Sequence, residues 1–163
     1  MDILKLVKEK EEKVIKIRRD LHQIPELELE LPKTMEYISK VLDEIGVNYK
    51  KLLNGNAIVV QIDGEQKGKC IAIRADSDAL PVVEKTGLSF ASTNGNMHAC
   101  GHDGHTAMAL GACMILNENR DKFKGTVKIF FQPGEETPGG ALPMIEEGCM
   151  ENPKVDAVIG LHE

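Results

Sequence analysis

The chain alternates amphipathic, helix-type segments with short apolar runs rich in β-branched residues, and this alternation limits its possible folds. Residues 2–22 and 33–45 carry aliphatic side chains at helical spacing, and the second segment stops at Gly46. Later segments are predicted as strands at 57–62, 70–74, 125–131 and 155–161, and as helices at 106–116 and 140–147. Strands that alternate with helices predict an α/β domain.

Two connections between these segments lead to further predictions. The runs 57–62 and 70–74 are joined by the turn-like residues 63–68, a connection of hairpin length. The segment from Ala75 to Ala99 contains Asp76, Asp78 and Pro81 and extends over about 25 residues, which exceeds the usual loop length. Because long ordered loops are often functional, we expect this one to contribute to a site.

Composition excludes several classes of protein. The 163 residues, 42% hydrophobic and 28% charged, suffice for one globular domain with a core. No apolar run approaches the roughly 20 residues of a membrane span, and the N-terminus lacks a signal-peptide core, so a cytoplasmic protein without membrane contact is expected. The net charge of −6 argues against nucleic acid as a partner.

The four cysteines show no paired spacing and are predicted to be free thiols. Cys70 and Cys113 lie in apolar runs and are expected in the core. Only Cys100 has polar neighbours, within the ten residues Met97 to Thr106, which also hold three histidines and an aspartate. Sulfur, imidazole and carboxylate ligands together bind transition metals, so this segment predicts a metal site.

Cys100 and His102 alternate and are the strongest candidates for ligands of one metal. His98 and His105 are open to two interpretations, as partners that orient the ligands or as residues that shape the start of the next helix. Two charged stretches outside this segment, residues 26–30 and Arg18-Arg19, are expected to be solvated and to carry no chemistry.

Further polar residues follow the predicted strands. Asp76 and Asp78 follow one strand, Glu135-Glu136 a second, and His162 a third. Taken alone, each could be a loop acid, a helix cap or a surface histidine. Reactive groups in α/β sheets collect at the carboxyl ends of strands, so we expect these residues to meet the Cys100 segment at one edge of the sheet. Adjacent carboxylates there can divide the work, one binding metal and one handling protons.

Five ordered motifs resemble those of a known family over nearly the whole chain. They are Arg19-Asp20-Leu21-His22-Gln23 with Pro25-Glu26-Leu27, Arg74-Ala75-Asp76-Ser77-Asp78-Ala79-Leu80-Pro81, residues 98–107, Phe131-Gln132-Pro133-Gly134-Glu135-Glu136, and Gly160-Leu161-His162. The chain resembles the N-terminal part of metal-dependent amidohydrolases of the aminoacylase and carboxypeptidase superfamily. The branch is that of hippurate hydrolases, N-acyl-amino-acid amidohydrolases, auxin-conjugate hydrolases and N-acetyldiaminopimelate deacetylases.

The resemblance implies a two-metal hydrolase of small N-acyl amino acids or peptides. Cys100 would bridge the metals, His102 and His162 would complete one site, and Glu136 would contribute to the other. Glu135 would be the general base for the attacking water, and Asp78 would orient or tune the site. Asp76 stands where related peptidases carry a histidine ligand and is left unassigned. The mixed ligands suit zinc or manganese, with cobalt or nickel also acceptable.

The resemblance also implies a three-layer catalytic domain with helices on a central mixed sheet. Residues 1–163 would form its N-terminal portion, without the smaller dimerisation or lid domain and without a histidine that completes the second metal shell. Ser77 and Gly134 replace the family's usual methionine and alanine, which should not alter ligation. We therefore expect the isolated chain to bind one metal weakly and to hydrolyse poorly or not at all.

Three other functions can be compared with these residues. A dipeptidase or carboxypeptidase of the same superfamily would use the same site. A non-catalytic metal-binding remnant would bind metal without turnover, so that a Glu135→Gln variant would change nothing measurable. A structural zinc site would have four cysteine or histidine ligands at short paired spacings, which this chain lacks.

Overall fold

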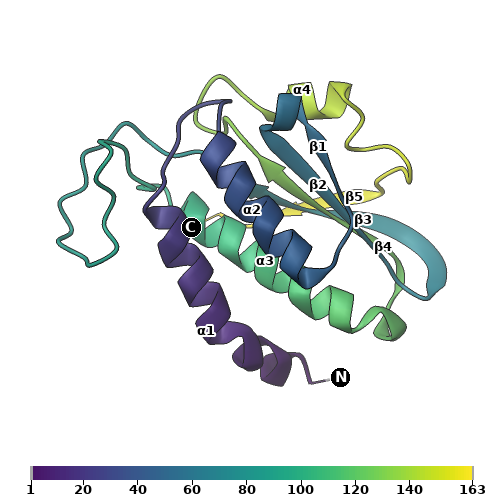
Figure 1. Cartoon of the computed structure of the whole chain (residues 1–163). Coiled ribbons are helices and arrows are strands. Elements are labelled where there is room, and N and C mark those ends of the chain that lie inside the picture. Colours follow the sequence, from purple (N-terminus) through teal and green to yellow (C-terminus); the bar gives the residue numbers. More distant parts are fainter. Residues whose placement is uncertain (1, 163) are drawn as a thin grey trace.

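The computed structural model describes residues 2–162 and has the expected α/β architecture, with helices packed on a mixed sheet of five strands (Figure 1). The elements are, in chain order, α1 (Ile3–His22), α2 (Pro32–Ile45), β1 (Tyr49–Leu52), β2 (Ala57–Asp63), β3 (Gln66–Asp76), α3 (His102–Glu118), β4 (Lys124–Gln132), α4 (Ala141–Glu146) and β5 (Ala157–Gly160). Short 3₁₀ helices lie at Leu53–Gly55 and Arg120–Lys122. None of the helices within residues 2–162 is long and apolar enough to cross a membrane.

The sheet has the strand order β1-β2-β4-β3-β5, so β2 and β3 are joined by the short loop that the sequence predicted but do not pair with each other. β4 lies between β2 and β3, antiparallel to the first and parallel to the second, so that Phe131 is opposite Ile58 on one side and Ala75 on the other. β4 takes the central place because its apolar side chains are buried on both faces of the sheet. The turn between β2 and β3 passes the start of β4, where the Gly64 N–H donates to the Gly125 carbonyl at 2.9 Å.

Helix α2 has a defined signal at each end. At its start, the Glu26 carboxylate accepts the backbone N–H groups of Lys33 and Thr34 at 3.2 and 2.8 Å. The prediction that Glu26 is merely solvated is therefore wrong, because its carboxylate satisfies N–H groups that lack partners within the helix. At its end, Gly46 adopts φ 73°, a left-handed conformation that glycine reaches without steric cost, as the sequence indicated.

Helix α3 begins four residues earlier than predicted, directly after Gly101. Its first turn contains His102, Asp103 and Gly104, which have low helix propensity and carry no apolar period. The Asp103 side chain accepts the N–H of Gly104 at 2.9 Å and so satisfies one free donor of this turn. As a result, His102 and His105 project from a helix and not from a loop.

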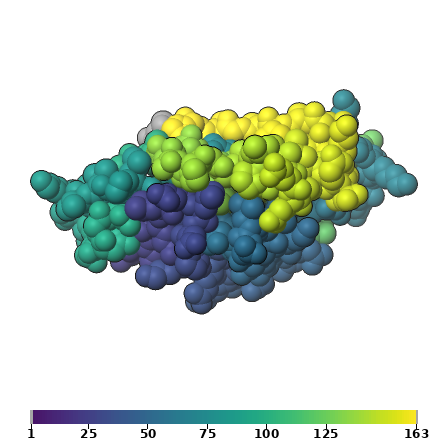
Figure 2. Space-filling view, turned by 90° about the horizontal axis from the view of Figure 1, so that it is seen from above, coloured from purple at the N-terminus to yellow at the C-terminus, as the bar shows by residue number. Residues whose placement is uncertain are grey.

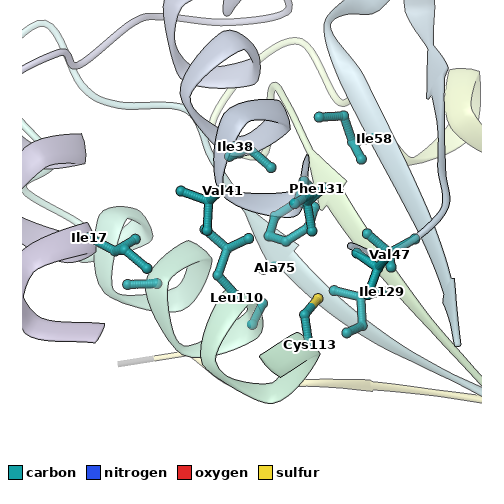
Figure 3. Packing of buried hydrophobic residues seen from close by; sticks show 14 of the residues in the cluster. Ile17, Ile38, Val41, Val47, Ile58, Ala75, Leu110, Cys113, Ile129 and Phe131 are labelled. Atoms are coloured by element: carbon teal, nitrogen blue, oxygen red, sulfur yellow. The ribbon is translucent and has the colours of Figure 1, made fainter. Parts of the chain in front are cut away.

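Two hydrophobic clusters hold the layers together. The larger one packs α1, α2 and α3 against one face of the sheet, with Leu110 and Phe131 fully buried (Figure 3). The smaller one lies on the other face, where α4 contributes Met144 beside Phe130. Cys70 and Cys113 are buried in these clusters as predicted, and all four cysteines are free thiols.

Residues 77–101 form the long loop between β3 and α3. Figure 2 shows this loop in teal at one end of the molecule, next to residues that follow β4. Leu80 and Met97 pair across its base, and the Asn94 amide donates to the Pro25 carbonyl at 2.8 Å. These contacts tie the loop to the residues between α1 and α2.

Candidate metal centre

Four segments meet at one edge of the sheet, as the sequence predicted. β3, β4 and β5 belong to a parallel set, so the residues that follow them lie at the same edge. Figure 1 shows the C-terminal end of the chain beside the first turn of α3, which starts at this edge. Asp78, Glu135, Glu136 and His162 are thereby brought next to the start of α3.

His102 is held with one ring nitrogen directed at this edge. Its Nδ1 donates to the carbonyl oxygen of Asp78 at 2.9 Å, so the neutral ring carries its lone pair on Nε2. Nε2 is buried without a hydrogen-bond partner among residues 2–162 and lies 3.6 Å from a Glu135 carboxylate oxygen and 4.0 Å from one of Glu136. A buried imidazole nitrogen that is unpaired and faces carboxylates fits a metal ligand.

Asp78 connects this histidine to the turn after β4. Its fully buried carboxylate accepts the backbone N–H groups of Glu135 and Glu136 at 2.9 and 3.1 Å. Burial opposes ionisation, but the hydrogen bonds from His102 and from these two N–H groups hold the pKa of Asp78 below its usual range. Asp78 therefore holds the backbone of both glutamates in place beside His102.

Cys100 lies two residues before the first residue of α3 and contributes a thiol to the candidate centre. Its Sγ lies 3.6 Å from Nε2 of His162, and ligand atoms of Cys100, His102 and Glu136 all lie within 4.8 Å of one another. Burial and the Glu136 carboxylate raise the pKa of the Cys100 thiol to about 11. A thiol among carboxylates ionises readily only when a cation balances the charge, so this donor set fits a divalent metal.

A second group of ligand-type atoms within 4.8 Å of one another is formed by Asp76, His102, His105 and His162. Asp76 is fully buried and accepts Nδ1 of His105 at 2.6 Å and a guanidinium N–H of Arg74 at 2.6 Å. The sequence left Asp76 unassigned and His105 open, and the structure pairs them behind the His102 ring.

The sequence did not predict the network of charged side chains that contacts Asp103 in the first turn of α3. Arg18, which was expected to be solvated, places its Nε 2.8 Å from the buried carboxylate of Asp103. His22 donates from Nδ1 to the same carboxylate at 2.7 Å, and its Nε2 lies 3.2 Å from Glu84. The motif that contains His22 was a signal of importance, but nothing in it indicated Asp103 as the partner.

His98 takes no part in either ligand group. It is 4% exposed, and both of its ring nitrogens are without a hydrogen-bond partner among the described residues. Burial lowers the pKa of His98 to about 4, so the ring is neutral at pH 7.

Comparison with known proteins agrees with this geometry. The model of peptidase family M20/M25/M40 matches residues 72–163. N-acetyl-L-cysteine deacetylase of Bacillus subtilis is 49% identical over 153 residues, which are 93% of this chain and 36% of that protein. N-acyl-L-amino acid amidohydrolase of Geobacillus stearothermophilus is 43% identical over 163 residues, 99% of this chain and 44% of that protein. The chain thus spans about two fifths of the length of these relatives.

A solved structure gives the same result. The YXEP protein of Bacillus subtilis, described as a dinuclear metal-binding peptidase from the M20 family, superposes with a TM-score of 0.90 at 42% identity. The match covers 96% of this chain and 44% of that one. With the family model matched over more than half of its residues, the chain belongs to peptidase family M20/M25/M40.

Proposed function

We propose that the protein hydrolyses the amide bond of N-acyl amino acids at a site that holds two divalent metal ions. The observation that carries this proposal is the convergence of ligand atoms of Cys100, His102 and Glu136 within 4.8 Å, with Nε2 of His102 left without a hydrogen-bond partner among the described residues. The printed names of two relatives, a deacetylase of an N-acetyl amino acid and an N-acyl-amino-acid amidohydrolase, support the substrate class.

The ligands in this proposal are Cys100 between the ions, His102 and His162 on one side, and Glu136 on the other. Divalent ions in such a site polarise the scissile carbonyl and make a water molecule more acidic. Zinc or manganese suits the mixed donor set, and cobalt or nickel would also be accepted.

Glu135 is assigned as the general base. Its carboxylate lies 3.6 Å from the ligand His102, and its side chain is 32% exposed, so both water and substrate can reach it. It would take the proton of the attacking water and pass it to the leaving amine. Asp78 contributes by holding the backbone N–H of Glu135 and the ring of His102 in one arrangement.

Residues 1–163 would form the N-terminal portion of the catalytic domain, in a cytoplasmic enzyme. The longer relatives have room for the smaller dimerisation domain and the additional histidine that we expect outside these residues. We expect the 163-residue chain on its own to bind one metal weakly and to turn over poorly.

The test measures metal content by mass spectrometry together with hydrolysis of hippurate and N-acetyl amino acids in added Mn²⁺ or Zn²⁺. Glu135→Gln should keep the metal and lose hydrolysis by at least about a hundredfold, since general-base catalysis contributes that much. Glu146→Gln, at an exposed glutamate of α4, is the matched control and should change neither. Folded protein that binds no metal would refute the proposal.

Two alternatives give different results in the same experiment. Metal bound without any turnover, unchanged by Glu135→Gln, would indicate a non-catalytic metal-binding protein. Faster cleavage of dipeptides than of N-acyl amino acids would indicate a dipeptidase or carboxypeptidase.

A further inference from the structure

A pocket with a volume of about 420 Å³ lies beside the candidate metal centre. Its lining comes from the end of α1, from the long loop and from the residues before α3, and includes Arg18, His22, Leu88, Met97, His98 and Cys100. We call it the loop pocket. Because Cys100 belongs both to this lining and to the metal-ligand group, the pocket adjoins the proposed reaction site.

His98 is the group in this lining that lacks a partner. The side chain is 4% exposed, yet neither ring nitrogen has a hydrogen-bond partner among residues 2–162. Burying an imidazole donor and acceptor without partners is costly, and native proteins rarely leave such groups unsatisfied. A polar group bound in the loop pocket would supply the missing partner.

The charged groups around the pocket are already paired with each other. Arg18 and His22 both contact the Asp103 carboxylate, at 2.8 and 2.7 Å, and His22 also lies 3.2 Å from Glu84. The two carboxylates balance the Arg18 charge whichever form the His22 ring takes, so this network leaves no surplus positive charge to attract an anion. A ligand carboxylate is therefore disfavoured here, and an uncharged ligand is favoured.

The remaining lining combines the aliphatic side chains of Leu88 and Met97 with the hydroxyl-bearing side chain of Thr86. Leu88 is 45% exposed at the solvent side, and Met97 lies next to His98 in the chain. A partly aliphatic wall with an unpartnered imidazole just behind its surface fits a group that has an apolar body and a single amide or carbonyl able to reach that ring.

We propose that the loop pocket binds the uncharged acyl half of the substrate, with His98 as its hydrogen-bonding and specificity residue. The inference rests on the proposed function, because the scissile amide must lie at the metal centre for its acyl group to reach this pocket. The charged amino-acid half would then lie on the other side of the centre. His98 would select acyl groups by size and polarity and would bind no metal.

The test compares benzamide with benzoate, two ligands of nearly equal shape that differ in charge. Each is titrated into metal-free, ¹⁵N-labelled protein, so that neither can bind through a metal. Benzamide should shift the backbone N–H signals of residues 86–88 and 97–101, and benzoate should bind about tenfold more weakly because it lacks a donor and carries a charge. Equal binding of both, or shifts elsewhere only, would overturn the proposal.

Variants locate the binding to individual side chains. His98→Phe keeps an aromatic ring of similar size without polar atoms and should weaken benzamide binding about tenfold. In case that variant does not fold, Leu88→Ala should weaken binding roughly threefold by removing apolar contact area at an exposed position. Ile145→Ala, at a similarly exposed isoleucine of α4, is the control and should leave binding unchanged.

The outcomes separate this inference from the proposed function. Equal benzamide affinity in the Leu88 and Ile145 variants would overturn the acyl pocket even if metal-dependent hydrolysis is found. If benzamide affinity falls in the Leu88 variant but the protein neither binds metal nor hydrolyses N-acyl amino acids, the ligand-binding pocket would be supported and the proposed enzymatic function would be rejected.

Discussion

The two halves of the candidate centre differ in what holds them in place. The inner wall, formed by Asp76, Asp78, His102 and His105, is at most 4% exposed, and its members are joined by hydrogen bonds. The outer rim, formed by Cys100, Glu135, Glu136 and His162, is partly or fully exposed. The fold therefore arranges the inner wall in advance, and we expect a bound metal to fix the rim side chains further.

The largest difference is expected between two histidine variants. His102→Ala should destabilise the metal-free protein by about 3 kcal/mol, because it leaves a cavity at a buried position and removes the hydrogen bond to the Asp78 carbonyl. His162→Ala should change that stability by less than about 0.5 kcal/mol, as expected for an exposed side chain. Both should weaken Zn²⁺ binding about a hundredfold, which is one ligand's share of the binding free energy.

Urea unfolding of the metal-free proteins and zinc titrations check this contrast. Equal destabilisation by the two variants would show that the inner wall is not arranged in advance.

A smaller loss of stability is expected when the hydrogen bonds between Asp78 of the inner wall and the backbone of the rim glutamates are weakened. Asp78→Asn should cost about 2 kcal/mol of unfolding free energy, since it weakens the hydrogen bonds that the backbone N–H groups of Glu135 and Glu136 donate to a charged carboxylate. Metal affinity should fall by roughly ten- to a hundredfold, the range for residues that orient ligands. Glu11→Gln, at an exposed glutamate of α1, is the control and should change neither quantity in the same assays.

The pH dependence of stability tests the same carboxylate. Because the folded-state pKa of Asp78 is lowered, its contribution is present above its unfolded value of about 4 and is lost as the pH falls through the folded value. Acid unfolding of the metal-free protein followed by circular dichroism should therefore depend less on pH in Asp78→Asn than in the wild type. Identical acid-unfolding curves would contradict this assignment.

The rim should show its dependence on metal through Cys100. A thiol with a pKa of about 11 must lose its proton on binding, so zinc affinity should rise about tenfold per pH unit between about pH 7 and 9. Cys100→Ser should reduce this slope by about one proton. Calorimetry in buffers of different ionisation enthalpy measures the protons released, and an unchanged number in Cys100→Ser would argue against the thiolate ligand.

The smallest expected effect concerns the turn that carries the two rim glutamates. Gly134 has φ 63°, and an added Cβ would lie 2.7 Å from the Leu29 side chain, so Gly134→Ala should cost about 1 kcal/mol of stability. Gly104→Ala is the control, since it has open space within α3 and should be neutral or stabilising. Zinc affinity should stay within about twofold for both variants, and a larger loss in Gly134→Ala would mean that the turn limits ligation.

Much of the fold follows from local pattern. Helical spacing of aliphatic side chains predicted α1 and α2, and Gly46 marked the end of α2. The polar residues after β3, β4 and β5 predicted where functional side chains would meet, because the ends of parallel strands share one edge. These signals involve neighbours in the chain and can therefore be seen without a structure.

Contacts between distant segments could not be predicted in this way. The place of β4 between β2 and β3 depends on which strand is buried on both faces, and the first turn of α3 carries no apolar period. Glu26 acts as a helix cap only because the chain returns toward it after Pro32.

The sequence by itself determined the class of fold and the set of candidate ligands, because spacing and residue chemistry are local properties. Only the tertiary structure decided that His22 and Asp103, 81 residues apart, share a hydrogen bond, and that His98 is buried without a partner beside a pocket. Burial and pairing depend on how whole layers pack, and that packing is settled by the complete set of side chains.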